Sequence, residues 1–230
     1  MSDSRVLLIT GASTGIGAET ARHAVRDGWR VVLAARSEDK LEALASELGG
    51  EEHASHKRAD VTEWEDQQAL VAHALEAFGQ VDAVFANAGF GAKRGFLEES
   101  PEQWRSMVLT NVLGPALSIR AALPHFKERG SGHFVLTSSV AGRRALPGSL
   151  YAATKHAVGA IGEGLRQEIA DTAIKVTLIE PGMVDTPFFD NPVQGALEPE
   201  DIARAVMYSL DQPDRVDVNE ILIRPINQPI

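Results

Sequence analysis

The feature that most constrains the fold is a regular alternation of short, almost wholly apolar runs with longer helical patterns. The apolar runs are rich in Val, Ile, Leu and Ala. They span Val6–Thr10, Val31–Ala35, Val81–Ala86, His133–Ser138, Val176–Glu180 and Glu220–Arg224. Runs that are apolar at successive positions are typical of strands buried on both faces, and such strands form parallel sheets covered by helices on each side.

The segments between the strands have the periodicity of amphipathic helices. In "SEDKLEALASEL" Ser37 can cap the helix, and its leucines recur on one face. In "TEWEDQQALVAHALEAFG" Thr62 can cap and Gly79 can stop the helix. No linker, repeat or low-complexity segment interrupts the pattern. The sequence therefore predicts one α/β domain over residues 1–230, a doubly wound parallel sheet of the Rossmann type with about seven strands and helices on both faces.

The segment "EHASHKRAD" is a less regular strand, the third in chain order. His53 and His56 invite a metal site, but no acidic or thiol ligand lies at a suitable spacing. We therefore interpret it as a polar edge strand and predict no metal site.

Composition narrows the choice of partners. The 230 residues carry a formal net charge of −10 with scattered positive charges, which disfavours nucleic acid and anionic membranes. The absence of Cys excludes disulfides and cysteine nucleophiles. The apolar run in "MSDSRVLLIT" is too short for a signal peptide core or a membrane span. We expect a cytoplasmic protein with a small soluble ligand.

A glycine-rich loop, "TGASTGIG", follows the first strand and opens a helix. Gly11 permits a tight turn, Gly15 allows close approach of a pyrophosphate, and Gly17 lets the helix pack on the sheet. The free N–H groups of the helix would bind the anion. An ordinary βα turn is the alternative, but strand, loop and helix occur in the order that a dinucleotide site requires.

A second motif lies in "SLYAATKHAVGAIGEGL", where Tyr151 and Lys155 fall one helical turn apart. Taken alone, this pair could be a half-buried Tyr beside a surface Lys. Together with the T-G-x-x-x-G-x-G loop, it makes the chain resemble the short-chain dehydrogenase/reductase family over nearly its whole length. Further matching stretches follow predicted strands in order: Ala59–Val61, Asn87–Gly89, Asn111 in "LTNVLG", Thr137–Gly142 and Glu180–Thr186.

The resemblance implies a dinucleotide-binding catalytic domain and assigns residues to the cofactor. Asp60 and Val61 would contact the adenine, and Lys155 the ribose hydroxyls. The remaining cofactor-binding residues would be Gly11, Ser13, Thr14, Gly15, Ile16, Gly17, Asn87, Ala88, Gly89, Tyr151 and, around the nicotinamide, Pro181, Gly182, Val184 and Thr186.

The chemistry of carbonyl reduction explains the Tyr–Lys pair. Hydride transfer puts negative charge on oxygen, so the site needs an acid and hydrogen-bond donors. Tyr151 can be the acid, and the ammonium of Lys155, with an oxidised nicotinamide, would lower its pKa towards neutrality. The resemblance adds that Ser139 bonds the substrate oxygen and that Asn111 anchors a water relaying protons to Lys155.

One departure from the family pattern concerns the catalytic serine. Ser139 precedes the x-A-G motif but lies twelve residues before Tyr151, whereas Ser138 has the family spacing of thirteen. Alternation along a strand would point the two side chains to opposite faces. We choose Ser139, because a one-residue deletion in the loop "GRRALPGSL" is absorbed more readily than a register slip at the strand end.

The end of the second strand indicates the type of nicotinamide cofactor. An acidic residue there would bind the 2′-hydroxyl of NAD, but Ala35 occupies that place and Arg36 follows it. A guanidinium suits the 2′-phosphate, so the sequence predicts NADP(H).

The substrate is indicated by a short lid. The segment "PFFDNPVQGALE" offers Phe188, Phe189, Val193 and Leu197 as an apolar wall and leaves little room for a large ligand. The tail "PDRVDVNEILIRPINQ" resembles bacterial NADP-dependent reductases of short 3-hydroxy acids, 3-oxo acids and aldehydes. We expect a small alcohol or carbonyl compound of this kind, and Arg143 or Arg144 could pair with a carboxylate.

Three other functions compete with this interpretation. A 3-oxoacyl-carrier-protein reductase would need a basic docking surface, for which Lys93, Arg94, Arg143 and Arg144 are candidates. A non-catalytic NADP(H)-sensing regulator would usually lack Tyr151 or Lys155. A sugar-nucleotide epimerase would have a longer C-terminal part. The resemblance also implies a homotetramer or homodimer, in which the small residues that follow Tyr151 would let this helix approach a partner subunit.

Overall fold

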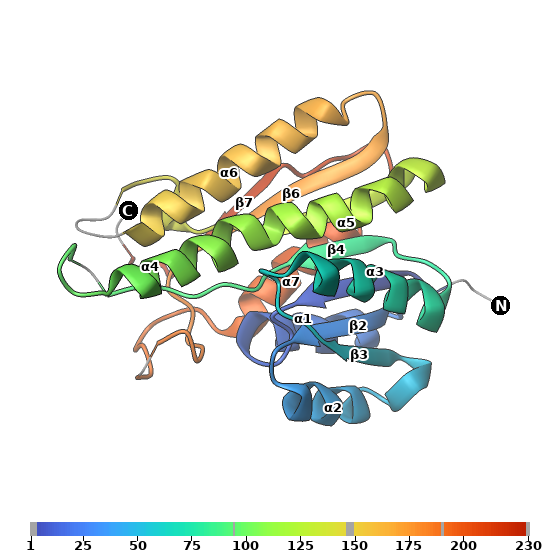
Figure 1. The fold of residues 1–230 in the computed structure, drawn as a ribbon, viewed down its shortest axis with the longest axis horizontal. Helices are drawn as coiled ribbons and strands as arrows, with labels where there is room; N and C mark the ends of the chain where they lie inside the picture. Colours follow the sequence, from blue (N-terminus) through green and yellow to red (C-terminus); the bar gives the residue numbers. More distant parts are fainter. Residues whose placement is uncertain (1–3, 94, 146–149, 190, 229–230) are drawn as a thin grey trace.

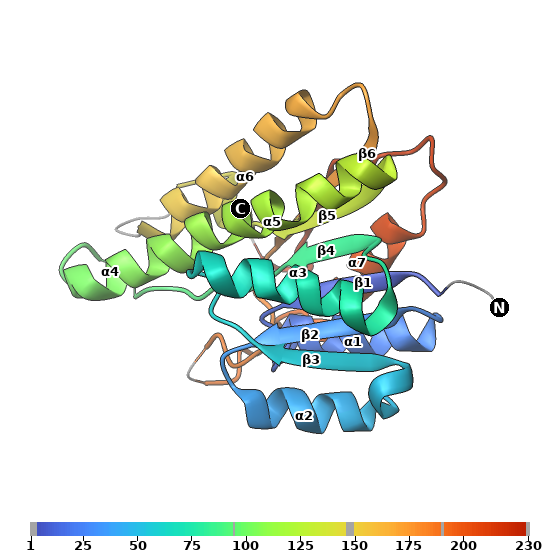
Figure 2. The same cartoon turned by 45° about the vertical axis from the view of Figure 1, so that its right-hand side comes forward.

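The computed structural model describes residues 4–93, 95–145, 150–189 and 191–228. Its centre is a sheet of seven parallel strands in the order β3-β2-β1-β4-β5-β6-β7 (Figures 1 and 2). The strands are β1 (Val6–Thr10), β2 (Arg30–Ala35), β3 (Ala54–Arg58), β4 (Ala83–Ala86), β5 (Ser131–Thr137), β6 (Ala173–Pro181) and β7 (Glu220–Ile223). This confirms the predicted doubly wound parallel sheet, with the polar strand β3 at one edge.

Helices cover both faces of the sheet. The α-helices are α1 (Gly15–Arg26), α2 (Glu38–Glu47), α3 (Trp64–Phe78), α4 (Pro101–Val108), α5 (Gly114–Arg129), α6 (Leu150–Glu168) and α7 (Pro199–Leu210). Short 3-10 turns lie at η1 (Gly50–Glu52) and η3 (Val140–Gly142), and a π-helical turn, η2 (Leu109–Leu113), joins α4 to α5. Helices α3, α5 and α6 pack on one face, and α1, α2 and α7 on the other.

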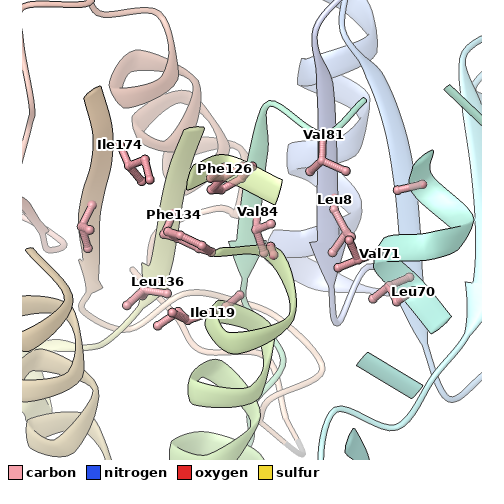
Figure 3. Close-up of a cluster of buried hydrophobic side chains, with 14 of the residues drawn as sticks. Leu8, Leu70, Val71, Val81, Val84, Ile119, Phe126, Phe134, Leu136 and Ile174 are labelled. Carbon is pink, nitrogen blue, oxygen red and sulfur yellow. The ribbon is translucent and has the colours of Figure 1, made fainter. Parts of the chain in front are cut away.

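The core on the α3 and α5 face shows why the strands are continuously apolar (Figure 3). Leu8, Val84 and Phe134 project from β1, β4 and β5 towards Leu70 of α3 and Phe126 of α5. The neighbouring residues of each strand enter a second apolar cluster on the opposite face. Alternate residues of one strand therefore serve two cores, which is the physical reason for the unbroken apolar runs.

The strand order reverses beside β1, which pairs with both β2 and β4. Thr10 at the end of β1 lies level with Ala34 and Ala86 of these two neighbours. The loops that leave the carboxyl ends of the three strands consequently meet at one place, where ligands of such sheets bind.

Two local findings refine the predicted helices. Gly79 ends α3 with a left-handed backbone, as expected, but the N-cap is Glu63 rather than Thr62. The Thr62 side chain instead donates a hydrogen bond to Asp60.

The continuous helix Pro101–Arg129 is long and apolar enough to cross a membrane by length and composition alone, a test that core helices also pass.

Candidate active site

A cleft of about 540 Å³ lies at the carboxyl ends of the strands. Its walls are made by the loops after β1 to β6 and by the start of α6, and its size is usual for a ligand pocket. The predicted cofactor residues that line it are Gly11, Ser13, Thr14, Gly15, Ile16, Arg36, Asp60, Val61, Asn87, Ala88, Gly89, Tyr151, Lys155, Pro181, Gly182, Val184 and Thr186. Gly17 is the one predicted cofactor residue that lies behind the wall.

The glycine loop is built to receive an anion. Gly15 has a φ of +56°, which only glycine adopts at low cost. A Cβ on Gly17 would lie 2.9 Å from Asn87 Nδ2 and would also collide with the Gly11 carbonyl, so the loop can close only over glycine. Helix α1 begins with neither a side-chain cap nor an acidic residue in its first turn. These features fit the pyrophosphate of a dinucleotide.

Asn87 ties together the strand ends beneath this loop. Its side-chain Nδ2 donates to the Thr10 and Gly11 carbonyls, and its Oδ1 accepts from the Thr137 hydroxyl at 3.2 Å. The backbone carbonyl of Thr137 in turn accepts from Lys155 Nζ at 2.8 Å. One hydrogen-bonded chain thus connects the glycine loop with α6.

The opposite end of the cleft collects charged residues from β2 and β3. Arg36 lines the cleft after Ala35, and Arg58 pairs in register with Ala35 on the neighbouring strand. Burial raises the pKa of Asp60, but hydrogen bonds from Thr62 and the charges of both arginines hold it below its ordinary value. Sequence reasoning missed Arg58, because only the pairing of β3 with β2 places it beside the β2 end.

Tyr151, Lys155 and Ser139 converge in the middle of the cleft. Tyr151 and Lys155 lie one turn apart on α6, with Lys155 Nζ 5.6 Å from the Tyr151 ring centre. Ser139 follows β5 and shares a hydrogen bond with the Tyr151 side chain. The site therefore has a phenol, a hydroxyl and an amine within one small volume.

Burial shifts the pKa values of both members of the Tyr–Lys pair in the chain alone. Burial raises the pKa of Tyr151 to about 12, although its hydrogen bond with Ser139 acts in the lowering direction. Burial lowers the pKa of Lys155, which is only 4% exposed, to about 8. The lowering of the Tyr151 pKa is expected with an oxidised nicotinamide bound, and it stays a prediction; in the chain alone, burial outweighs the hydrogen bond with Ser139.

The two serines after β5 have different partners. Ser138 Oγ donates to the Lys155 backbone carbonyl at 3.0 Å, within the protein interior. Ser139 Oγ accepts from the Ala141 N–H and donates to the Pro181 carbonyl, and it faces Tyr151. This placement favours Ser139 over Ser138. The predicted one-residue deletion falls in the loop between Ser139 and Tyr151, of which residues 146–149 lie outside the described residues.

Asn111 lies in the π-helical turn η2 and does not line the cleft. Its side chain is 1% exposed and bonds both backbone groups of Phe90 as well as the Thr154 hydroxyl. A Cβ on Gly89 would lie 3.0 Å from Asn111 Oδ1 and 3.6 Å from Lys155 Nζ. Asn111 is thus near Lys155 and fixes the wall of the cleft, while the water relay remains a prediction.

Aromatic side chains line the cleft beside Tyr151. Phe188 and Phe189 of the lid line the cleft, as expected, but Val193 and Leu197 do not. Leu197 instead pairs with Val184 and packs on the α7 side of the core. Sequence reasoning missed Phe90, Gln103 and Thr110, which α4, η2 and the loop after β4 bring to the wall. The run of motif residues through Gly89 was the one signal that could have pointed to Phe90.

Arg143 has acidic partners that its sequence position did not suggest. Its Nε donates to Glu180 Oε2 at 2.7 Å, and its guanidinium also pairs with Glu220. The predicted use of Arg143 to bind a substrate carboxylate is therefore disfavoured. Arg144 lies exposed after η3, and Arg94 is outside the described residues.

Comparisons with known proteins agree with this geometry. The family model described as short chain dehydrogenase matches residues 5–195. An uncharacterised oxidoreductase of Staphylococcus haemolyticus is 44% identical over 97% of this chain and 98% of its own. The chain belongs to the short-chain dehydrogenase/reductase family of oxidoreductases.

Solved structures extend the likeness to three dimensions. An alcohol dehydrogenase of the archaeon Thermococcus sibiricus, complexed with 5-hydroxy-NADP, superimposes with a TM-score of 0.91 at 34% identity over 99% of both chains. A serine dehydrogenase complexed with NADP+ gives a TM-score of 0.90 at 30% identity, over 98% of this chain and 96% of its own. Solved relatives hold NADP in some cases and NAD in others.

Proposed function

We propose that this oxidoreductase is an NADP(H)-dependent enzyme that transfers a hydride between the nicotinamide and a small alcohol or carbonyl compound. One observation carries the proposal: the Ser139–Tyr151 hydrogen bond and Lys155 lie in the same cleft as the glycine loop. A proton donor beside a dinucleotide site is what carbonyl reduction needs. Both Tyr151 and Lys155 face the cleft, which favours an enzyme over a cofactor-sensing regulator.

The roles of the side chains follow from their positions. The nicotinamide supplies the hydride when bound. The Tyr151 hydroxyl donates its proton to the substrate oxygen, and the Ser139 hydroxyl donates a hydrogen bond to the same oxygen. The protonated amine of Lys155 stabilises the phenolate that remains on Tyr151. In alcohol oxidation the same groups act in reverse, with Tyr151 as the base.

The preference for NADP(H) is supported by the charges at the β2 end. No acidic residue stands at Ala35, and Arg36 and Arg58 flank this position. Within the described residues Arg36 lines the cleft and has no ion-pair partner at salt-bridge distance, so its guanidinium can pair with a 2′-phosphate, and Arg58 adds positive charge on the neighbouring strand. We expect kcat/KM to be at least about tenfold higher with NADPH than with NADH. Equal values would contradict the preference.

The test of the proposed activity is an NADPH-oxidation screen over small aldehydes, ketones, 3-oxo acids and a β-ketoacyl thioester. Tyr151→Phe should lower kcat by about 100-fold or more and leave NADPH affinity unchanged, because ring and packing persist without the proton donor. Tyr208→Phe is the matched control, since Tyr208 is 58% exposed on α7. Retention of more than about a tenth of kcat in Tyr151→Phe would overturn the role of Tyr151. Turnover of thioesters alone would favour the carrier-protein reductase.

We also propose that the protein is a homo-oligomer, and we favour a tetramer over a dimer. Helices α5 and α6 lie side by side on one face of the molecule (Figures 1 and 2). Val108, Leu109 and Leu113 are exposed on the helix that leads into α5. Gly159 and Gly164 on α6 have open space where a Cβ would stand, so a second copy could approach closely.

A further inference from the structure

The substrate end of the cleft is the part beside Tyr151, lined by Phe90, Gly91, Gln103, Pro187, Phe188 and Phe189. The rings of Tyr151 and Phe188 lie 5.7 Å apart and those of Phe188 and Phe189 lie 5.1 Å apart, both edge to face. A Cβ on Gly91 would lie 2.6 Å from Phe188 Cζ, so the Phe188 ring rests directly on the Gly91 backbone. The described part of the substrate end therefore has an aromatic wall, and Gln103 adds a neutral polar side chain to it.

Charged side chains are distributed unevenly along the cleft. Among the described lining residues, the charged ones are Arg36, Asp60 and Lys155. Arg36 and Asp60 belong to the ends of β2 and β3, at the far edge of the sheet from Ser139 and Pro181. Lys155 is buried and already donates to the Thr137 carbonyl. The described wall around Phe188 thus has no arginine guanidinium that could form a bidentate ion pair with a substrate carboxylate.

Arg143, the arginine nearest to Ser139 in the chain, forms ion pairs with two glutamates. Arg143 bridges Glu180, which is 2% exposed, and Glu220. One guanidinium between two carboxylates leaves this cluster with a formal charge of −1. None of these three residues lines the cleft, and the two carboxylates hold the Arg143 guanidinium outside it, so Arg143 offers no pairing to a substrate carboxylate.

From these contacts we infer that the enzyme acts on uncharged carbonyl compounds with a hydrocarbon substituent, aliphatic aldehydes and ketones, and discriminates against anionic 3-oxo acids. This inference rests on the proposed function and narrows its substrate class. The hydrocarbon part packs on Phe188 and Phe189, and the carbonyl oxygen faces Tyr151 and Ser139. A carboxylate placed there loses hydration without a partner that replaces it.

The test compares matched pairs on the wild-type protein with NADPH: acetoacetate with its methyl ester, and succinic semialdehyde with its methyl ester. The esters should have at least about tenfold higher kcat/KM than the acids. In a series from propanal to hexanal, kcat/KM should rise about fourfold for each methylene that the aromatic wall buries. Equal kcat/KM values for the acids and their esters would overturn the inference and leave the proposed function intact. A kcat/KM that does not change from propanal to hexanal would do the same. Failure to reduce any carbonyl compound would overturn the proposed function itself.

A variant pair tests the aromatic wall directly. Phe188→Ala should lower kcat/KM for hexanal about tenfold or more and change that for propanal much less, because only the longer chain reaches the ring. Phe96→Ala is the matched control, since Phe96 is exposed outside the cleft, against Trp104. Unchanged NADPH affinity in both variants shows that the fold and the cofactor site persist. An equal loss for both aldehydes in Phe188→Ala would contradict contact between ring and substrate chain.

Discussion

At the scale of single residues, Tyr151 shows how burial alone shifts the pKa of a catalytic phenol. Its pKa is raised to about 12 by burial in the chain alone, although Lys155 lies one turn away. The chain has only two tyrosines, so Tyr208→Phe leaves Tyr151 as the single titrating phenol. Ultraviolet titration of this variant should give a pKa above the ordinary value of about 10. Saturating NADP+ should lower that pKa, because a positive charge favours the phenolate. A pKa that NADP+ leaves unchanged would contradict electrostatic tuning of Tyr151.

Arg36 carries a second prediction at the residue scale. Arg36→Ala should raise KM for NADPH about tenfold or more and leave KM for NADH nearly unchanged, because only NADPH has the 2′-phosphate. Ala35→Asp combined with Arg36→Asp should reverse the preference between the two cofactors. Arg215→Ala is the control, since Arg215 is exposed and does not line the cleft. Steady-state kinetics with both cofactors checks the outcome, and equal changes with NADPH and NADH would exclude a contact with the phosphate.

At the scale of elements, a buried histidine links the pairing of β5 and β6 to pH. His133 bonds the Thr177 hydroxyl at 2.8 Å, and burial, with the charge of Lys175, lowers its pKa to about 3. Between about pH 6.5 and pH 3 the unfolded chain binds the proton and the folded chain does not, so stability is lost as the pH falls through this range. We expect about 2–3 kcal/mol of this loss between about pH 7 and pH 4.5.

Urea unfolding at these two pH values measures the effect. His133→Gln should lose less stability on acidification than the wild type, because it lacks the buried base. His53→Gln should behave like the wild type, since His53 is exposed before β3. If His133→Gln and the wild type lose equal stability on acidification, the histidine is not responsible.

At the scale of the whole molecule, the exposed helix that leads into α5 makes the proposed oligomer testable. Leu113 is 39% exposed, and its replacement by Glu would place a charge in the interface that we propose. Leu113→Glu should therefore shift the protein towards monomers in light scattering coupled to size exclusion. Leu97→Glu is the matched control, since Leu97 is 97% exposed outside α5 and α6. Monomeric wild-type protein would contradict the proposed assembly.

The sequence by itself determined the parallel sheet, the glycine loop and the pairing of Tyr151 with Lys155. These features depend on local spacing: apolar runs set strand burial, and a four-residue interval fixes two side chains on one helical face. The order of motifs at strand ends also placed nearly all predicted cofactor residues on one cleft. Gly17 and Asn111 lie behind its wall, because they shape the loops that carry the lining residues.

Only the tertiary structure decided the features that depend on contacts between distant parts of the chain. Arg143 pairs with Glu180 and Glu220, which lie 37 and 77 residues further along the chain. No local pattern could therefore show that its guanidinium already has carboxylate partners. The orientation of Ser138 and Ser139 follows from how β5 meets α6 and β6. Phe188 lies beside Tyr151 because the lid folds back over Gly91. The direction of the Tyr151 pKa shift belongs to the same class, since burial is a property of the packed molecule and not of the residue spacing.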